Sequence, residues 1–400
     1  MKDQNTLKQL ESLNPWWQGD YTVQEIISRP YYSGALYSNT LLEQKAKIID
    51  IVTGARRVGK TTLLKDVVQN LLKKGTNAKN ILYITGELPA LQNVTILEVY
   101  QTYTENLRPK RTVFWFIDEV QELANWQQQV KYLHDNYDIK FYLTGSSGLI
   151  LNRQTSKLTG RFVETHLMPL SFGEFLVFKK IKPTADKVKK RELAMEYLNS
   201  GGYPEYVLDQ NEALLTQTVE SIMYRDLLTQ YGIRNPAILK DLLQLLCDKV
   251  GTPVSFNIIA KDLKMDPQTA QFYLKYLQDV YLVYPLFRQG KSHKIVKGFI
   301  PKYYINDTGI LRIFSQTPRE GHLFENAVFL HLYREHLRTR TELSYGYMAG
   351  KEVDFIMDGQ MFDAKSKPLP SELSPDVTYV VKKADDSLGY RQLELQEFLL

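Results

Sequence analysis

The sequence predicts an α/β protein whose core is a parallel sheet covered by helices. Four runs rich in β-branched and aromatic residues alternate with segments of helical periodicity between Lys47 and Gly145. Strands that alternate with helices are typical of βαβ units, which form parallel sheets. The runs are almost continuously apolar, as expected of strands that are buried on both faces.

The composition narrows the class of protein. The chain has 400 residues, of which 44% are apolar and 24% charged, which excludes a disordered or fibrous protein. At about 100–200 residues per domain, two to four domains are expected. The one cysteine, Cys247, excludes an internal disulfide and, with six scattered histidines, gives no zinc signature. No apolar run approaches the roughly 20 residues that cross a bilayer, so we expect a cytoplasmic protein without a membrane partner.

The first predicted strand and helix flank a phosphate-binding loop. The strand covers 47–54, and an amphipathic helix begins at Lys60. Between them, GARRVGKT at 54–61 fits G-x-x-x-x-G-K-[ST] in the context that this pattern requires. Gly54 and Gly59 let the backbone wrap phosphates, and the helix N-terminus adds positive potential.

The side chains of this loop predict a site for ATP and Mg²⁺. Lys60 is expected to reach the β- and γ-phosphates. The Thr61 hydroxyl is expected to hold Mg²⁺, and Thr62 to line the α-phosphate side. A chance match in a glycine turn is the alternative.

The next two predicted strands, at 80–86 and 112–119, lead to a pair of acids. Asp118 and Glu119 follow an apolar run, at the carboxyl end where open α/β sheets bind ligands. We expect Asp118 to hold Mg²⁺ through water and Glu119 to act on the attacking water as a general base. A helix-capping acid pair is the alternative.

The fourth predicted strand, at 139–145, ends in hydroxyl residues. Its end would lie between the two nucleotide motifs, so a hydroxyl there could orient water or the γ-phosphate. Thr144 is the first candidate and Ser146 the second. Ordinary turn formation is the alternative.

Together these motifs resemble those of the AAA+ ATPases. More narrowly, VTGARRVGKTTLL, IDEVQ, LTGSS, KLTGRF and MPLSFGEF resemble the signature of a prokaryotic AAA+-type family, and the likeness covers nearly the whole chain. It implies that Arg161, in KLTGRF, is an arginine finger that reaches the γ-phosphate of a neighbouring subunit in a homo-oligomer. A structural arginine at a turn is the alternative.

The resemblance and the changes in sequence character divide the chain into five segments. SGGYPEYV at 200–207 resembles the glycine-proline element in the lid of related signalling ATPases. The segments are an N-terminal lead-in (1–46), an AAA+-type P-loop ATPase core (47–178), a helical lid (179–234), a winged-helix module (235–302) and a nuclease-like α/β domain (303–400).

The segment 254–287 has the pattern of a helix, a turn, a second helix and a strand, which is typical of winged helices. A basic string with interleaved aromatics follows and favours contact with DNA phosphates. Its cations are Arg288, Lys291, Lys294, Lys297 and Lys302. A winged helix that contacts protein is the alternative.

The segment 350–367 predicts a β-hairpin around Asp358-Gly359. Counting outward from this turn, Met357 faces Gln360, Ile356 faces Met361 and Phe355 faces Phe362. The register therefore gathers four polar side chains on one face, which are Glu352, Asp354, Asp363 and Lys365.

This hairpin resembles the PD-(D/E)xK nuclease core, in which an acid from a preceding helix completes the site; Glu325 occupies that place. Two departures are that Asp363 stands where glutamate is usual and that the following helix is scarcely present. Opposed carboxylates repel unless a proton or cation lies between them, and Mg²⁺ or Mn²⁺ would suit their oxygens. An inactive domain with a salt-bridged hairpin is the alternative.

The sequence thus predicts a Mg²⁺-dependent ATP-hydrolysing AAA+-type protein that acts on or binds DNA through its C-terminal half. The alternative is an ATP-gated signalling or scaffold ATPase that binds a protein partner and carries an inactive nuclease-like domain. The net charge of +5 permits DNA binding but does not favour it by itself.

Overall fold

The computed structural model describes most of the chain in two compact units. The first unit is Met1–Gly54 with Gly59–Leu167, and the second is Ala55–Val58 with Met168–Leu400. The described residues are 2–19, 26–42, 48–91, 93–145, 158–227, 231, 233, 237–290, 300–367, 369, 374–384 and 391–400.

A five-stranded parallel sheet forms the centre of the first unit, in the order β2-β3-β4-β1-β5. The parallel sheet predicted from the alternation of strands and helices is therefore confirmed. β4 lies between β1 and β3, so its end separates the phosphate loop from the acidic strand end. The strands are β1 (Ile49–Thr53), β2 (Ile81–Thr85), β3 (Val113–Asp118), β4 (Ile139–Gly145) and β5 (Phe162–His166).

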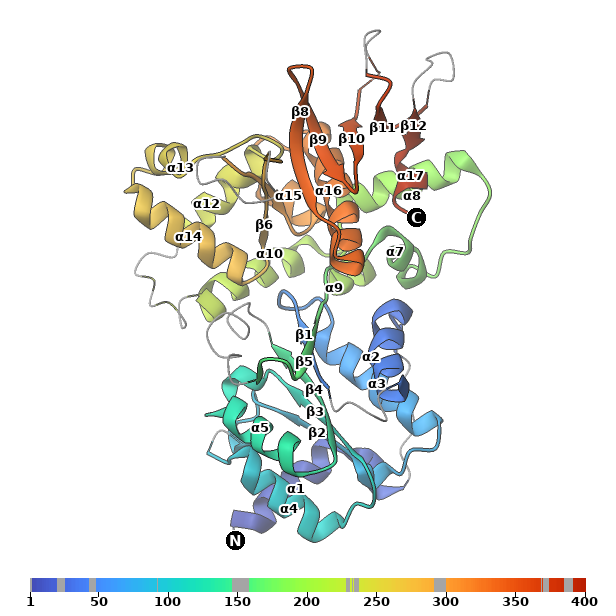
Figure 1. Ribbon diagram of the computed structural model, residues 1–400, viewed down its shortest axis with the longest axis vertical. Coiled ribbons are helices and arrows are strands. Elements are labelled where there is room, and N and C mark those ends of the chain that lie inside the picture. The colour runs from blue at the N-terminus through green and yellow to red at the C-terminus, as the bar shows by residue number, and fades with distance from the viewer. Residues whose placement is uncertain are drawn as a thin grey trace. The chain divides into compact units, whose positions relative to one another are not determined.

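Helices cover both faces of this sheet. Figure 1 shows α2 and α3 on one side of it and α4 and α5 on the other. Trp115 and Phe141, which point to the same face, belong to one buried cluster with Tyr103 and Val130 of the covering helices. The helices are α1 (Lys2–Leu13), α2 (Pro30–Leu42), α3 (Lys60–Lys73), α4 (Ile96–Leu107) and α5 (Trp126–Asn136).

The N-terminal segment, expected as a lead-in, packs on the first unit and covers the edge strand β2. The side chain of the buried Asn14 forms two hydrogen bonds with the backbone of Tyr83 in that strand. Its amide group donates to Tyr83 O at 2.8 Å, and its Oδ1 accepts from Tyr83 N at 2.6 Å. The indole N–H groups of Trp16 and Trp17 both donate to Ile81 O, at 3.1 and 2.8 Å. Side chains thus occupy backbone groups that an edge strand would otherwise expose.

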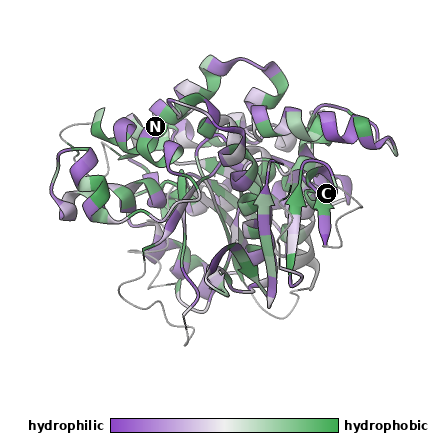
Figure 2. Ribbon diagram, turned by 90° about the horizontal axis from the view of Figure 1, so that it is seen from above, coloured by the Kyte–Doolittle hydropathy of each residue, from purple (hydrophilic) through white to green (hydrophobic). Residues whose placement is uncertain are grey.

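The second unit begins with a helical region. The compact units divide after Leu167, whereas the sequence placed the end of the core at 178. The helices drawn in Figure 2 carry both hydrophobic and hydrophilic residues along their length. The helices before residue 230 are α7 (Phe172–Phe178), α8 (Lys187–Ser200), α9 (Pro204–Asp209) and α10 (Glu212–Ser221), followed by a π-helical turn at Ile222–Leu227.

Three helices and a two-stranded ribbon follow. The helices are α12 (Ala237–Asp248), α13 (Phe256–Asp262) and α14 (Pro267–Asp279), and the antiparallel strands are β6 (Val283–Leu286) and β7 (Lys302–Ile305). An isolated bridge joins Pro253 to Lys302, so a third segment touches the ribbon. The helix, turn, helix and strand predicted over 254–287 are thus present, and their assignment as a winged helix stays a prediction.

A mixed sheet forms the C-terminal part, in the order β12-β11-β10-β9-β8. The β9–β10 hairpin has the predicted register, with Met357 opposite Gln360 and Phe355 opposite Phe362. β11 pairs in parallel with β10. The elements are α15 (Thr308–Phe314), α16 (Glu320–Thr339), β8 (Leu343–Met348), β9 (Lys351–Met357), β10 (Gln360–Lys365), β11 (Val377–Val381), β12 (Gln392–Glu394) and α17 (Leu395–Phe398).

Among the residues that the structure describes, no helix combines the length and the apolar composition that crossing a bilayer requires.

Candidate functional site

The predicted phosphate loop connects β1 to α3. Gly59 is the N-cap residue of α3 and has φ +99°, a left-handed conformation that glycine adopts at little cost. Gly59 has no side chain that could cap the first amides of the helix, which is the arrangement of helix N-termini that bind anions. The loop backbone therefore has the form that the motif predicts.

Lys60 lies between this loop and the acidic strand end. Its side chain is 4% exposed. Its Nζ donates to Gly54 O at 3.1 Å and lies 3.7 Å from Glu119 Oε1. One ammonium thus contacts both motifs that the sequence assigned to the nucleotide.

Asp118 accepts hydrogen bonds from three hydroxyl groups. Its Oδ2 accepts from Thr61 Oγ1 at 2.7 Å and from Tyr83 OH at 2.9 Å. Its Oδ1 accepts from Thr144 Oγ1. Burial, and after it the charge of Asp118, raises the pKa of Tyr83, so this phenol keeps its proton and acts as a donor. The sequence analysis missed Tyr83.

Glu119 is oriented by a turn directly after β3. Its φ of +47° is unusual for a residue other than glycine and is found at sites where the surroundings fix the backbone. Its N–H donates to Thr144 Oγ1 at 2.9 Å, and its Oε2 accepts from Gln121 Nε2 at 2.6 Å. Thr144 therefore contacts both acids from the end of β4, between the two motifs.

Three residues on β1 and β5 form a second layer behind the loop. Thr53 Oγ1 donates to Glu164 Oε1 at 2.7 Å and lies 3.3 Å from His166 Nδ1. Burial, and after it the charge of Lys60, lowers the pKa of His166 to about 3, so its imidazole is neutral at pH 7. Burial raises the pKa of Glu164.

The donor set fits a hard cation next to a phosphate chain. Thr61 and Asp118 contribute hydroxyl and carboxylate oxygens, which are the ligands that Mg²⁺ prefers. Lys60 contributes the cation that phosphate oxygens require. The structure thus brings together Lys60, Thr61, Asp118, Glu119 and Thr144; Thr62 lies on α3 with an exposed side chain, and Ser146 lies outside the described residues.

Arg161 lies at the other end of the sheet. It precedes β5, and its carbonyl accepts from Ile49 N at the start of β1, whereas the phosphate loop follows the far end of β1. Five strand residues at about 3.3 Å each separate these two ends. Its guanidinium pairs with Asp135, with Nε 3.0 Å and Nη2 3.4 Å from the carboxylate oxygens. Lys131 and then Arg161 lower the pKa of Asp135.

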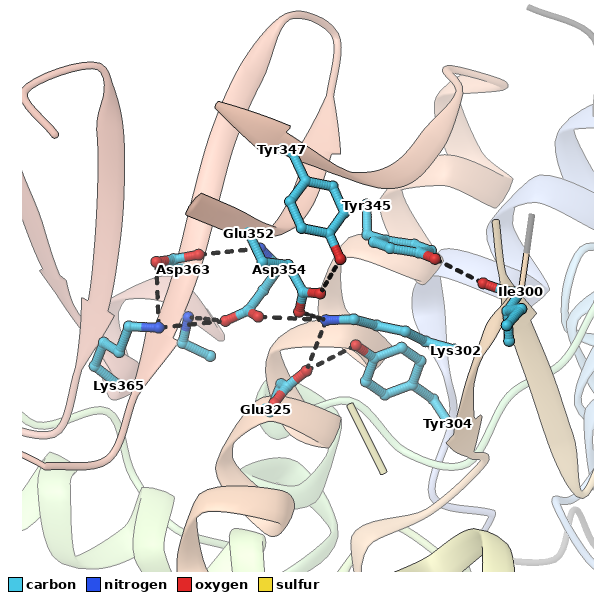
Figure 3. Close-up of polar contacts among 11 residues, drawn as sticks. Ile300, Lys302, Tyr304, Glu325, Tyr345, Tyr347, Glu352, Asp354, Asp363 and Lys365 are labelled. Atoms are coloured by element: carbon cyan, nitrogen blue, oxygen red, sulfur yellow. Dashed lines mark hydrogen bonds and ion pairs between the residues drawn. The ribbon is translucent and has the colours of Figure 1, made fainter. Parts of the chain in front are cut away.

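A second candidate site lies in the C-terminal sheet and is drawn in Figure 3. The carboxylates of Asp354 and Asp363 each accept a hydrogen bond from a backbone N–H on the opposite strand of the hairpin. Asp354 N donates to Asp363 Oδ1 at 3.0 Å, and Ala364 N donates to Asp354 Oδ2 at 3.1 Å. Lys365 Nζ lies 3.2 Å from Asp363 and 3.7 Å from Asp354. The predicted face therefore assembles around these three residues.

Glu352, the fourth residue of the predicted face, contacts Lys302 Nζ at 2.7 Å and Tyr347 OH at 3.0 Å. Lys302 also lies 3.7 Å from Glu325 and 3.4 Å from Asp354. The sequence analysis placed Lys302 in an exposed basic string, yet the side chain is fully buried. Its position among IPKYYI, an apolar and aromatic strand, was the available signal.

No metal geometry accompanies this cluster. Within the described ranges, no group of three or more His, Cys, Asp or Glu side chains is arranged to hold a metal ion. The positions of the opposed carboxylates therefore do not require the divalent cation that was expected between them. Lysine ammonium groups lie against the carboxylates, as in the salt-bridged alternative.

The winged-helix-like segment exposes polar side chains on α14. Gln268, Gln271 and Lys275 are exposed there, and Phe272 is 49% exposed beside them. Lys275 Nζ lies 2.6 Å from Asp279. Of the predicted basic string, Lys291, Lys294 and Lys297 lie outside the described residues.

Comparison with known proteins defines the class of the first unit. Residues 46–176 match a family model described as an AAA domain, and residues 191–320 match a domain of unknown function (DUF8612). With the sheet order and the phosphate loop described above, the first unit is an AAA-type P-loop domain with the fold of the AAA+ ATPases.

The chain belongs to the same family as the uncharacterized protein MJ1544 of Methanocaldococcus jannaschii, to which it is 30% identical over 358 residues, covering 82% of this chain and 79% of the relative. An uncharacterized protein of Haemophilus influenzae is 29% identical over 348 residues, which cover 82% and 84% of the two chains.

Solved structures give weaker likenesses. The Thermotoga maritima RuvB Holliday junction branch migration motor is 18% identical, with 69% of this chain and 92% of that chain covered and a TM-score of 0.35. AMPPCP-bound DnaA from Aquifex aeolicus is 16% identical, with 64% and 89% covered and a TM-score of 0.32. Scores this low carry no argument about function.

Proposed function

We propose that this protein is a Mg²⁺-dependent ATPase of the AAA+ type. The observation that carries the proposal is the 2.7 Å hydrogen bond from Thr61 to Asp118, which joins the phosphate loop to the acidic strand end. Lys60 and Glu119 complete this arrangement at 3.7 Å from each other. Phosphate binding, metal binding and activation of water thus have candidate groups within one small volume.

Each residue has a role that follows from its contacts or, for Thr62, from its place in the loop motif. Lys60 would bind the β- and γ-phosphates, and Thr62 would line the α-phosphate side. Thr61 and Asp118 would hold Mg²⁺, which neutralises charge on the phosphate oxygens. Glu119, held by Gln121, would orient the attacking water and accept its proton. Thr144 would keep the two acids in register through its contacts with both.

The test is ATP turnover by the full chain in Mg²⁺. We expect Lys60→Ala to lose turnover by at least about 100-fold, and Glu119→Gln to bind ATP but to hydrolyse it about 100-fold more slowly. Lys73→Ala, which removes an exposed lysine from the last turn of the same helix, is the matched control and should leave turnover unchanged. Unchanged turnover in Lys60→Ala would rule out this site.

We further propose that Arg161 acts on the nucleotide of a second copy. Its position at the opposite end of β5 from the phosphate loop argues against action within its own chain. Arg161→Ala and Lys60→Ala should each be inactive alone, but their mixture should recover turnover, because mixed oligomers pair an intact loop with an intact Arg161. Two inactive variants that stay inactive when mixed would leave Arg161 as a structural partner of Asp135.

For the C-terminal half, we propose DNA binding through α14. Support comes from the order of α13, turn, α14 and the β6–β7 ribbon, and from the exposed Gln268, Gln271 and Lys275 on one helix. Amide and ammonium groups of this kind contact bases and phosphates. Phe272, exposed on the same helix, favours the alternative of a protein partner.

Fluorescence anisotropy with duplex DNA at 50 and 200 mM salt distinguishes the two. We expect binding that weakens steeply with salt and that Lys275→Ala reduces several-fold. Lys189→Ala is the matched control, because Lys189 is also exposed and also pairs with an acid on its own helix. Absence of salt-sensitive binding would favour the protein partner, with Phe272→Ala as the variant to test.

A further inference from the structure

The acidic cluster of the C-terminal sheet holds a buried lysine at its centre. Lys302 is 0% exposed, and its Nζ lies 2.7 Å from Glu352, 3.4 Å from Asp354 and 3.7 Å from Glu325. Figure 3 shows this ammonium between the three carboxylates, with Lys365 on the far side of Asp354. Lys302 comes from β7, the second strand of the two-stranded ribbon, whereas the acids come from α16 and β9.

Lys302 and Lys365 contact different oxygens of the same carboxylate, that of Asp354. Asp354 Oδ1 lies 3.4 Å from Lys302, and Asp354 Oδ2 lies 3.7 Å from Lys365. Lys365 also contacts Asp363, at 3.2 Å. A divalent metal would need the same oxygens at about 2.0–2.6 Å. The ammonium of Lys302 and such a metal therefore cannot occupy the centre of the cluster together.

Backbone pairing with two other segments fixes the position of Lys302. It pairs with Leu286 across the ribbon and forms the bridge to Pro253. Tyr304, two residues on, points to the same side of the strand, and its hydroxyl donates to Glu325 Oε1 at 2.8 Å. One strand thus directs a cation and a hydrogen-bond donor at the same carboxylate.

The cluster still carries more negative than positive charge. Four carboxylates, Glu325, Glu352, Asp354 and Asp363, face two ammonium groups. Burial, and after it the charge of Asp354, raises the pKa of Glu325 to about 7, in spite of the neighbouring Lys302. Removal of Lys302 would leave these acids with one cation, and another cation would then be strongly favoured.

We propose that Lys302 is the resident cation of this cluster, that it keeps divalent metal out of the nuclease-like sheet, and that without its ammonium the same carboxylates bind a hard divalent cation such as Mn²⁺. The inference concerns only the second unit and does not depend on ATP hydrolysis. The ammonium of Lys302 would then neutralise the acidic face without a metal ion. In this arrangement the domain would not cleave DNA by metal-dependent hydrolysis.

The experiment measures binding of Tb³⁺, a hard cation whose emission nearby tyrosines sensitise, to the full chain without nucleotide. Tyr304 and Tyr347 contact the acids of the cluster and would serve as the donors. We expect Lys302→Met to bind Tb³⁺ at least tenfold more tightly than the wild type does, and Mn²⁺ to displace it. Adding Asp354→Asn to Lys302→Met should abolish the gain.

Lys365→Met is the matched control. It makes the same substitution at the lysine on the other side of Asp354, whose side chain is 36% exposed, and it leaves Lys302 in place. We expect no gain in Tb³⁺ binding from Lys365→Met. An equal gain in both variants would mean that net charge, and not the position of Lys302, controls the site.

The wild type tests the proposal even if Lys302→Met fails to fold. Tb³⁺ or Mn²⁺ binding by the wild type that Asp354→Asn abolishes would show that the cluster is open to metal, and would overturn the proposal. A folded Lys302→Met protein, with the wild-type circular dichroism spectrum and no gain in Tb³⁺ binding, would overturn it equally. Lys302→Arg, which keeps the charge, should behave as the wild type.

Discussion

At the scale of single residues, the most informative is Asp118, because three hydroxyl groups fix its carboxylate. Thr61 and Thr144 could be named from the sequence, since each follows a recognisable strand or loop motif. Tyr83 could not, because nothing in a strand sequence says which strand will lie beside it. Its approach to Asp118 depends on β2 being the neighbour of β3, which is a property of the folded sheet.

Tyr83→Phe should slow ATP turnover without unfolding the protein. The change removes one hydrogen bond to a charged carboxylate, which is worth about 1.5–3 kcal/mol, so we expect kcat to fall by at least about tenfold. Tyr103→Phe is the control, because it removes a hydrogen bond of a buried tyrosine to a backbone carbonyl, that of Lys79, elsewhere in the unit. If both variants keep the wild-type kcat, Tyr83 does not position Asp118.

Gly251 supports the acidic cluster through its lack of a side chain. It has φ +76°, and a Cβ there would lie 2.4 Å from both Glu325 carboxylate oxygens. Gly350 has a similar φ of +80° but open space around it. We expect Gly350→Ala to cost about 1 kcal/mol of unfolding free energy from backbone strain alone, and Gly251→Ala to cost clearly more. Equal thermal unfolding midpoints for the two variants would contradict the close contact with Glu325.

At the scale of elements, the sequence predicted the strands well because their apolar runs are strong local signals. The β9–β10 hairpin was predicted with its register from the Asp358-Gly359 pair. Both residues have the positive φ that such a two-residue turn needs. The N-terminal cover of β2 was not predicted. Its bonds run from side chains to a distant backbone and leave no periodic pattern in the sequence.

Asn14 should be the most sensitive residue of that cover. Asn14→Ala removes two hydrogen bonds to the backbone of Tyr83 and leaves those groups buried, so we expect a loss of about 2–4 kcal/mol of unfolding free energy in the first unit. Asn106→Ala is the control, because Asn106 is exposed and bonds only to Thr102 in its own helix. A similar loss in both variants would mean that the edge does not depend on Asn14.

At the scale of the whole molecule, contacts between distant parts of the chain escape prediction. Asp307 is the N-cap residue of α15, and its Oδ1 accepts from Ile310 N at 3.1 Å. Its Oδ2 also accepts from Gly202 N at 2.6 Å, across 105 residues of sequence. Lys302 is a similar case, since its acidic partners follow it by 23 to 52 residues. Charge and spacing alone indicate neither pairing.

Asp307 should make the stability of the second unit depend on pH. Burial raises its pKa from 3.8 to about 6, so the folded state holds the proton more tightly than the unfolded state does. This contribution to stability is complete below pH 3.8 and is lost as the pH rises through 6. The difference in unfolding free energy between the wild type and Asp307→Asn, which cannot titrate, should fall by about 2 kcal/mol from pH 4 to pH 7. A difference that stays constant over this range would contradict the raised pKa.

The cover of β2 also bears on how the ATPase domain can be produced alone. A fragment cut where the AAA match begins, at residue 46, would lack Asn14, Trp16 and Trp17. The edge strand β2 of this fragment would then expose unpaired backbone N–H and C=O groups. Any other extended chain could pair with them, including β2 of a second fragment. Such a fragment would precipitate or form fibres, although every residue of its nucleotide site is present. Inclusion of residues 2–19 would restore a closed edge.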